Sequence, residues 1–233
     1  MIRREFITLL SGAVAWPLAA RARGCPTGTV PPDRAMMRTF TRLDFANRME
    51  RRWLLLYAAL PLVYIVTGRL GLLLATPPGY ATAVFLPAGI AVTATFVAGA
   101  SALPGTFLGS FLLNLWIGYL IEGRLNLTQS AAALVIAAGS MTQAAIGGAA
   151  LRRTTGYPAP FDDAHHILAF LLLAPIFCLT SATMSLSGLW ALGLLEISAL
   201  RMNWTTWWLG DTLGVVVALP LMLVLADESW RTR

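Results

Sequence analysis

Asp211 is an acidic residue inside a stretch of sequence that otherwise suits a lipid bilayer. The stretch runs from Trp204 to Leu223 and reads WTTWWLGDTLGVVVALPLML. A charged side chain in the hydrocarbon layer costs on the order of 2–3 kcal/mol even on the lenient insertion scale, and ionisable residues in such places commonly serve a function. The acid therefore predicts either a buried ion pair or a binding site.

Arg69 is the first candidate partner for Asp211. It lies sixteen residues past Trp53 in another apolar run, about 24 Å from the inner membrane surface and about 6 Å from the outer one. Asp211 lies seven residues past Trp204, about 10 Å below the outer surface. We therefore expect the two side chains to pair. Two interpretations stay open, because such a pair either fixes the helix register or belongs to a binding site.

Three further residues reach a comparable depth on two other apolar runs. Asn114 lies about 12 Å from the outer surface by the same arithmetic. Pro87 and Gly89 break helices, and a proline inside a helix frees a backbone carbonyl one turn earlier, which a ligand or another helix can use. The predicted ligand-binding or structural polar layer comprises Arg69, Pro87, Gly89, Asn114 and Asp211.

Other small and polar residues predict packing. Two glycine pairs have the spacing of close helix seams, Gly105 with Gly109 and Gly210 with Gly214. Gln143 lies in a further apolar run, where a packing hydrogen bond is the favoured role.

A pair of histidines stands at the expected start of a helix. His165 and His166 follow Asp162 and Asp163. A solvated pair at a helix start is favoured there over a metal site or a pH sensor. The chain has no nucleotide-binding loop, serine-hydrolase elbow, metalloprotease motif or paired-cysteine motif. No catalytic residue, metal or cofactor is therefore predicted, and the protein is expected not to be an enzyme.

The composition is that of a polytopic membrane protein. Hydrophobic residues make up 57% of the chain and charged residues 12%, with a mean hydropathy of +0.69, which leaves too little charge to cover a soluble domain. All 17 basic residues are arginines, and the net charge is +6. These arginines mostly flank apolar runs, where they set membrane orientation, so a nucleic-acid partner is rejected. Cys178 lies in an apolar run and predicts a core residue.

The apolar runs predict an all-α, polytopic transmembrane helix bundle of about six spans in contact with the lipid bilayer. Each run is close to the roughly 20 residues that a bilayer requires. The stretch Leu186–Leu200 is apolar but short and carries Glu196, so we expect a re-entrant or interfacial segment there. The six predicted spans are 53–75, 81–100, 102–121, 128–150, 165–187 and 204–226.

The distribution of arginines predicts the orientation of these spans. With the N-terminus in the cytoplasm, the loop 151–166 is cytoplasmic and carries Arg152 and Arg153. The tail after residue 226 is then cytoplasmic too, with two more arginines. Six spans therefore satisfy the positive-inside rule, with both termini in the cytoplasm of a bacterium and the protein in its inner membrane.

The first residues conflict with this orientation. They read MIRREFITLLSGAVAWPLAARARGC, in the order of a bacterial export signal. However, six arginines lie between residues 34 and 52, and such clusters stay in the cytoplasm. Our hypothesis is that 1–35 are a fused or mis-started leader and that translation starts at Met36 or Met37. The predicted organisation is a leader 1–35, a basic segment 36–52, a membrane domain 53–226 and a tail 227–233.

Four segments in order resemble the first-type MASE domain, a membrane-associated sensor domain of bacterial signalling proteins. They are TGRLGLLLA, FLPAGIAV, LPGTFLGSFLLNL and WWLGDTLGVVVALPLML, and the resemblance covers about residues 53–226. The Pro-Ala-Gly of the family falls on Pro87, Ala88 and Gly89, its Gly-Asn segment on Gly109 and Asn114, and its Trp-Trp-x-Gly-Asp on Trp207, Trp208, Gly210 and Asp211.

The resemblance implies a non-catalytic sensory input module for an undefined ligand or membrane state. Family members normally join a cytoplasmic histidine kinase or a cyclic-di-GMP enzyme and continue with further spans, whereas this chain ends seven residues after Ala226. We expect a truncated member that lacks an output domain and signals through a separate partner of that kind, with homo-oligomers as a further partner class. The alternatives are a small transporter or substrate-capture subunit, and a non-functional fragment.

Overall fold

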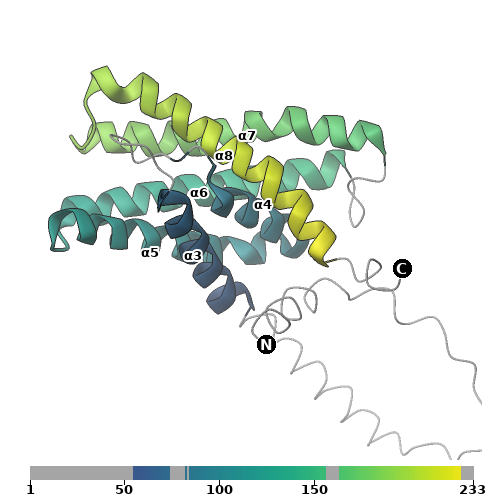
Figure 1. Ribbon diagram of the computed structural model, residues 1–233, viewed down its shortest axis with the longest axis horizontal. Coiled ribbons are helices and arrows are strands. Elements are labelled where there is room, and N and C mark those ends of the chain that lie inside the picture. The colour runs from purple at the N-terminus through teal and green to yellow at the C-terminus, as the bar shows by residue number, and fades with distance from the viewer. Residues whose placement is uncertain (1–54, 74–81, 83, 156–162, 227–233) are drawn as a thin grey trace, which may run out of the picture. The chain divides into compact units, whose positions relative to one another are not determined.

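The computed structural model describes residues 55–73, 82, 84–155 and 163–226, and these are almost entirely helical, without strands (Figure 1). The predicted all-α helix bundle is therefore confirmed. Helical segments follow one another along the chain as η1 (Leu55–Ala59), α3 (Leu60–Leu73), α4 (Leu86–Ala98), η2 (Gly99–Ala102), α5 (Leu103–Glu122), α6 (Leu127–Thr154), α7 (Ala164–Ala191) and α8 (Ile197–Ala226).

The chain divides into two compact units, of which Leu56–Leu223 holds nearly all of the described residues. The other unit comprises 1–55 and 224–233, and only Leu55 and the last residues of α8 are described in it. The predicted leader 1–35, the basic segment 36–52 and the tail 227–233 lie outside the described residues, so their interpretation stays a prediction.

Five helical runs in the described residues are long and apolar enough to cross a membrane. One of them, Leu86–Glu122, has 37 residues, about twice what a bilayer needs. The run reverses at η2, where Gly99 has a φ of +71°. Pro87 in α4 and Leu113 in the middle of α5 both lie beside Gly68 of α3, so the two helices fold back side by side. Counted as α4 and α5, this run brings the described helices into agreement with the six predicted spans.

The stretch Leu186–Leu200 is not a re-entrant segment, and its interfacial position stays a prediction. Helix α7 continues to Ala191 and α8 begins at Ile197, so residues 192–196 form the turn between two long helices. Leu186 and Leu189 pack in one apolar cluster with Trp204 and Trp207. The apolar character of the segment thus serves contacts within a helical hairpin rather than insertion from one side.

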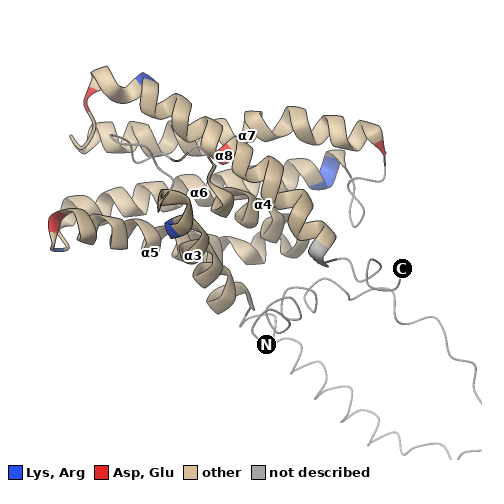
Figure 2. Ribbon diagram, viewed as in Figure 1, with Lys and Arg blue, Asp and Glu red and all other residues tan. Residues whose placement is uncertain are grey.

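The helices run alternately between two ends of the bundle, which are named here after residues at the ends of α6 and α5. The Arg152 end holds the starts of α3, α5 and α7 and the ends of α4, α6 and α8, and the Glu122 end holds the opposite termini. Most of the charged residues that the structure describes lie at or near the ends of the helices (Figure 2). This distribution suits a bundle whose middle contacts hydrocarbon.

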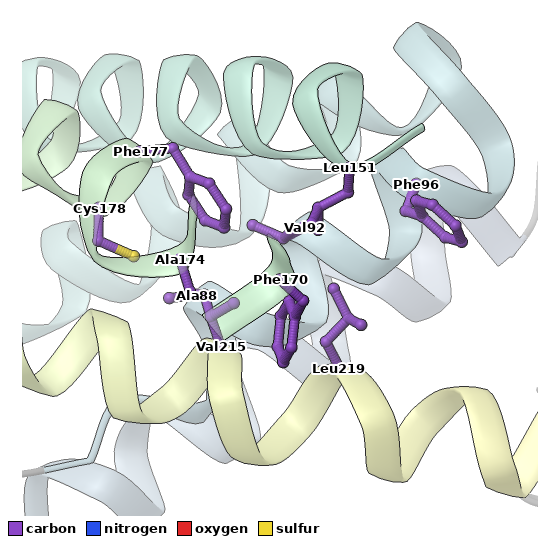
Figure 3. Packing of buried hydrophobic residues seen from close by; sticks show 10 residues of the cluster. All are labelled: Ala88, Val92, Phe96, Leu151, Phe170, Ala174, Phe177, Cys178, Val215 and Leu219. Atoms are coloured by element: carbon purple, nitrogen blue, oxygen red, sulfur yellow. The ribbon is translucent and has the colours of Figure 1, made fainter. Parts of the chain in front are cut away.

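Helix α4 is central to the bundle, and its short apolar sequence explains why. All but four of its 13 residues are buried, and a helix that is apolar on every side belongs inside a larger structure. Its hydroxyl groups turn back to their own helix, since Thr93 and Thr95 donate to the carbonyls of Gly89 and Ala91. The core around it lies between α4, α6, α7 and α8 (Figure 3): Ala88, Val92, Phe96, Leu151, Phe170, Ala174, Phe177, Cys178, Val215 and Leu219.

The buried Cys178 belongs to this core, which confirms the role that its sequence context predicts.

Arg152 bonds to the end of α4, so we expect Arg152 to contribute more to stability than the adjacent Arg153. The Arg152 guanidinium donates to the carbonyls of Phe96 and Val97, the second at 2.7 Å. Helix C-termini leave carbonyls without partners, and hydrogen bonds from charged groups contribute about 1.5–3 kcal/mol. Arg152→Ala is therefore expected to lower the free energy of unfolding by about 1–2 kcal/mol in detergent.

Arg153→Ala is the matched control, because Arg153 is equally exposed and its substitution removes the same charge. We expect it to change the free energy of unfolding by less than about 0.5 kcal/mol. Equal losses in the two variants would show that net charge at this end, and not the capping contact, sets the effect.

Candidate functional site

Asp211 lies at the middle of α8 with only 3% of its surface exposed. Side-chain hydrogen bonds reach it from Ser181 on α7, Gln143 on α6 and Trp207 one turn earlier on α8. A serine hydroxyl, an amide NH₂ and an indole N–H can all donate to a carboxylate. The carboxyl group is therefore held by three helices at once, through neutral donors.

A pocket adjoins Asp211 in the half of the bundle nearest the Glu122 end. It contains about 420 Å³ of unfilled space, part of it continuous with the exterior. Its lining is half polar and half apolar: Tyr64, Thr82, Ser110, Asn114, Ser140 and Asp211, with Leu72, Phe85, Leu113, Ile117, Ile136 and Trp207.

A chain of hydroxyl groups crosses the pocket opposite the acid. Tyr64 Oη donates to Ser140 Oγ at 3.3 Å, and Ser110 Oγ donates to the same oxygen at 3.1 Å. Asn114 Nδ2 donates to the Ser110 carbonyl at 2.8 Å. These contacts join α3, α5 and α6, so the polar groups of the pocket are fixed by the same packing that holds the helices together.

Helix α4 begins later than the predicted second span, 81–100. Thr82, Val84 and Phe85 are non-helical, and α4 begins at Leu86. Pro87 consequently lies in the first turn of α4, where its missing N–H removes no helical bond. The expected release of a helical carbonyl by Pro87 is wrong for this reason.

The start of α4 packs directly against the backbone of α8. Phe85 N–H donates to the Gly210 carbonyl at 2.9 Å. A Cβ at Gly214 would overlap the Phe85 carbonyl, and a Cβ at Gly89 would overlap the Gly214 carbonyl. Only glycine at both positions permits this approach, which brings the α4 N-terminus next to the segment of α8 that carries Asp211.

The other glycine pair lies between α3 and α5. A Cβ at Gly105 would overlap the Leu56 carbonyl, and one at Gly109 would lie 2.8 Å from the Cβ of Tyr64. This close approach sets the position of Tyr64, and hence of its hydroxyl in the pocket.

Arg69 does not pair with Asp211, so that prediction is wrong. Its guanidinium carbon lies 4.8 Å from the ring centre of Trp116 on α5, in a cation–π contact. Within the ranges that the structure describes, the ion pair found joins His165 to Asp163. The depth arithmetic gave the position of Arg69 along its helix but not its direction around the helix axis, where it reaches Trp116 on α5.

A family model described as MASE1 matches residues 55–232. The chain belongs to the MASE1 family. MASE1 domains are membrane-associated sensor domains of signalling proteins, so the resemblance that the four sequence segments carry is confirmed. No curated protein matches the chain, and no solved structure matches it. This MASE1 domain is thus an integral membrane protein of the sensory class.

Of the five residues in the predicted polar layer of this MASE1 domain, two meet in the pocket. Asp211 and Asn114 both line it. Pro87 and Gly89 lie in the first turn of α4 behind the pocket, where they set the approach of α4 to α3 and α8. Arg69 lies at Trp116, outside the lining.

The sequence reasoning missed several polar residues of the MASE1 pocket. Ser110 precedes Asn114 by four residues, Ser140 precedes Gln143 by three, and Trp207 precedes Asp211 by four. Residues at these spacings share one face of a helix. Polar pairs at helical spacing inside apolar runs were the signal that would have found them.

The histidine pair of the MASE1 domain lies outside this site, at the start of α7. His165 Nδ1 is 3.2 Å from Asp163 Oδ1, and this hydrogen bond, together with the backbone N–H of His165, lowers the pKa of the Asp163 carboxyl. Asp163 therefore stays ionised as the N-cap of α7. Its contribution to the stability of the folded protein is lost only as the pH falls through that lowered pKa. Among the described residues no group of three potential metal ligands occurs.

Proposed function

We propose that this MASE1 domain is a non-catalytic sensory input module of a bacterial inner membrane that reads the occupancy of the Asp211 pocket. One observation carries the proposal: a buried carboxyl group borders unfilled space, is held by neutral donors, and has no arginine partner among the described residues. A buried acid is costly inside a membrane. A ligand that compensates it gives the pocket two states of different stability, which is what a sensor requires.

The placement of arginines supports the orientation of this module. Arg152 and Arg153 lie at one end of the bundle, and the arginine-rich stretch 34–52 precedes α3, which starts at that same end. The positive-inside rule then places the Arg152 end in the cytoplasm and the pocket half toward the periplasm. Both termini would face the cytoplasm, where a separate histidine kinase or cyclic-di-GMP enzyme can respond, with or without a second copy of the chain.

The proposal is tested in the native bacterium by deleting the gene and restoring it with variants at equal membrane abundance. Deletion and Asp211→Asn are expected to change the same output, either cyclic-di-GMP concentration or kinase-dependent phosphotransfer. Glu196→Gln, the same chemical change at an exposed turn, should restore the wild-type output. If neither output responds to deletion, the sensory role is wrong.

A second candidate, a small transporter or substrate-capture subunit, is favoured by one feature of the fold. Helix α4 begins at Leu86, after the non-helical residues Val84 and Phe85, and interrupted helices line the substrate sites of many secondary transporters. Uptake of labelled methylammonium into proteoliposomes separates the two functions. Time-dependent accumulation would favour transport, whereas binding without accumulation would favour the sensor.

A further inference from the structure

We infer that the Asp211 pocket binds a small organic cation, an amine whose ammonium group lies at the Asp211 carboxylate and whose apolar part lies against the apolar side of the lining. This inference rests on the proposed sensory function and names the chemical class of its ligand. Three features of the described residues support it: the charge balance, the hydrogen-bonding capacity and the divided lining.

The charge balance of the pocket favours a cation. The three groups that bond to Asp211 are Ser181, Gln143 and Trp207, and all three are neutral, so none of them supplies a positive charge. Arg69, the arginine nearest in depth, is placed over Trp116. The N-terminus of α4 offsets only about half an elementary charge. The ionised form of Asp211 therefore has no counter-charge among the described residues, and a singly charged cation would supply one.

The hydrogen-bonding groups favour a ligand that donates. Gln143 is 2% exposed, and its Oε1 has no hydrogen-bond partner among the described residues. The side-chain amide of Gln143 bonds to Asp211, and Gln143 lies one turn along α6 from Ser140, which lines the pocket. An ammonium group has three donors and no acceptor. An ammonium group therefore matches a pocket that offers a carboxylate and hydroxyl oxygens, next to a buried amide oxygen that has no partner among the described residues.

The divided lining favours an organic cation over a metal ion. Leu72, Ile117 and Ile136 give the pocket an apolar side, and Phe85 and Trp207 add aromatic rings. Aromatic faces attract organic ammonium groups, whereas Ca²⁺ takes about 6–8 oxygen ligands, commonly with several carboxylates. One carboxylate beside apolar and aromatic side chains suits a singly charged organic ligand better than a metal ion.

The experiment measures binding to the purified full chain in nanodiscs by calorimetry and by thermal unfolding. The probes are methylammonium, butylammonium and phenethylammonium chloride, compared with 2-phenylethanol, phenylacetate and sodium chloride at constant ionic strength. At least one amine is expected to bind saturably and to raise the unfolding temperature. Asp211→Asn should weaken that binding at least tenfold, and Glu196→Gln should leave it unchanged.

Each other outcome overturns the inference in a recognisable way. Equal binding of the neutral alcohol or the anion would show that the charge of Asp211 does not select the ligand. A saturable effect of sodium that Asp211→Asn abolishes would assign the site to a metal ion. If no amine binds while the cellular output still depends on Asp211, the ligand class is wrong but the sensory function stands. If both experiments are negative, both proposals fall.

Discussion

Gly214→Ala is expected to lower the free energy of unfolding by at least about 3 kcal/mol, the upper range for overpacking a core. The added Cβ would overlap the Phe85 carbonyl and lie 3.1 Å from the Leu86 nitrogen. Both are backbone atoms, so no side-chain rotation relieves the contact. The start of α4 must move away from α8, which breaks the bond from Phe85 N–H to the Gly210 carbonyl. Reversible unfolding in mixed micelles, followed by circular dichroism, measures the loss.

Gly71→Ala is the control for this substitution. Gly71 is also a buried helical glycine, but its Cβ would lie 3.5 Å from the nearest atom, the Val84 carbonyl oxygen, in ordinary contact. Since alanine favours helix over glycine by up to about 1 kcal/mol, we expect Gly71→Ala to be neutral or slightly stabilising. A stable Gly214→Ala variant would mean that α4 and α8 do not approach as closely as described.

Asp211→Leu is expected to cost on the order of 3 kcal/mol of folding free energy in the absence of ligand, because it leaves the three donors that hold the carboxyl group without an acceptor. The groups affected are the Ser181 hydroxyl, the Gln143 amide and the Trp207 indole. Leucine has the same branched shape and the same number of side-chain heavy atoms, so the substitution leaves no cavity and the loss reports unsatisfied polar groups. The unfolding free energy in micelles is again the measurement.

Asp211→Asn separates the structural role of this residue from its charge. Asparagine keeps an acceptor oxygen, and its NH₂ group can donate to Gln143 Oε1, which lacks a partner among the described residues. The ligand-free unfolding free energy should therefore change by less than about 1 kcal/mol, although the sensory response is lost. A loss as large as that of Asp211→Leu would favour the alternative that the charged carboxylate mainly fixes the helix register. Glu196→Leu at the exposed turn should stay within about 0.5 kcal/mol of wild type.

The two substitutions act on one arrangement. Helix α4 begins only at Leu86, and its start packs closely on α8 through Gly89 and Gly214. Phe85 and Thr82, which precede it, line the pocket together with Asp211. Gly89 and Gly214 therefore affect the site without contacting a ligand, because they fix the start of α4 and so the position of Phe85 in the pocket lining.

The amino-acid sequence by itself determined the class of the protein. Long apolar runs can satisfy their backbone hydrogen bonds in a bilayer only as helices or barrels, and runs of this length predict helices. The same reasoning identified Asp211, because an acidic side chain in such a run costs free energy in the bilayer and so requires an explanation. Four short segments in order were enough to indicate the family, which the family model matches over residues 55–232.

Only the tertiary structure decided which polar residues meet. Depth along a helix follows from counting residues, but the direction of a side chain around the axis depends on how each helix is rotated against its neighbours. Arg69 shows the consequence, since it reaches Trp116 instead of Asp211. Nothing in the apolar runs of Ser181 and Gln143 marks these residues as partners of Asp211. They bond to it because the packing of α6, α7 and α8 brings their side chains together.

The start of α4 was beyond sequence reasoning for a related cause. The run 81–100 is apolar throughout, and hydropathy does not distinguish helix from extended chain that another helix covers. The backbone of Phe85 can leave the helical path because Gly210 on α8 accepts its N–H and Gly214 leaves room for its carbonyl. That compensation comes from a segment more than a hundred residues away, so it exists only once the chain has folded.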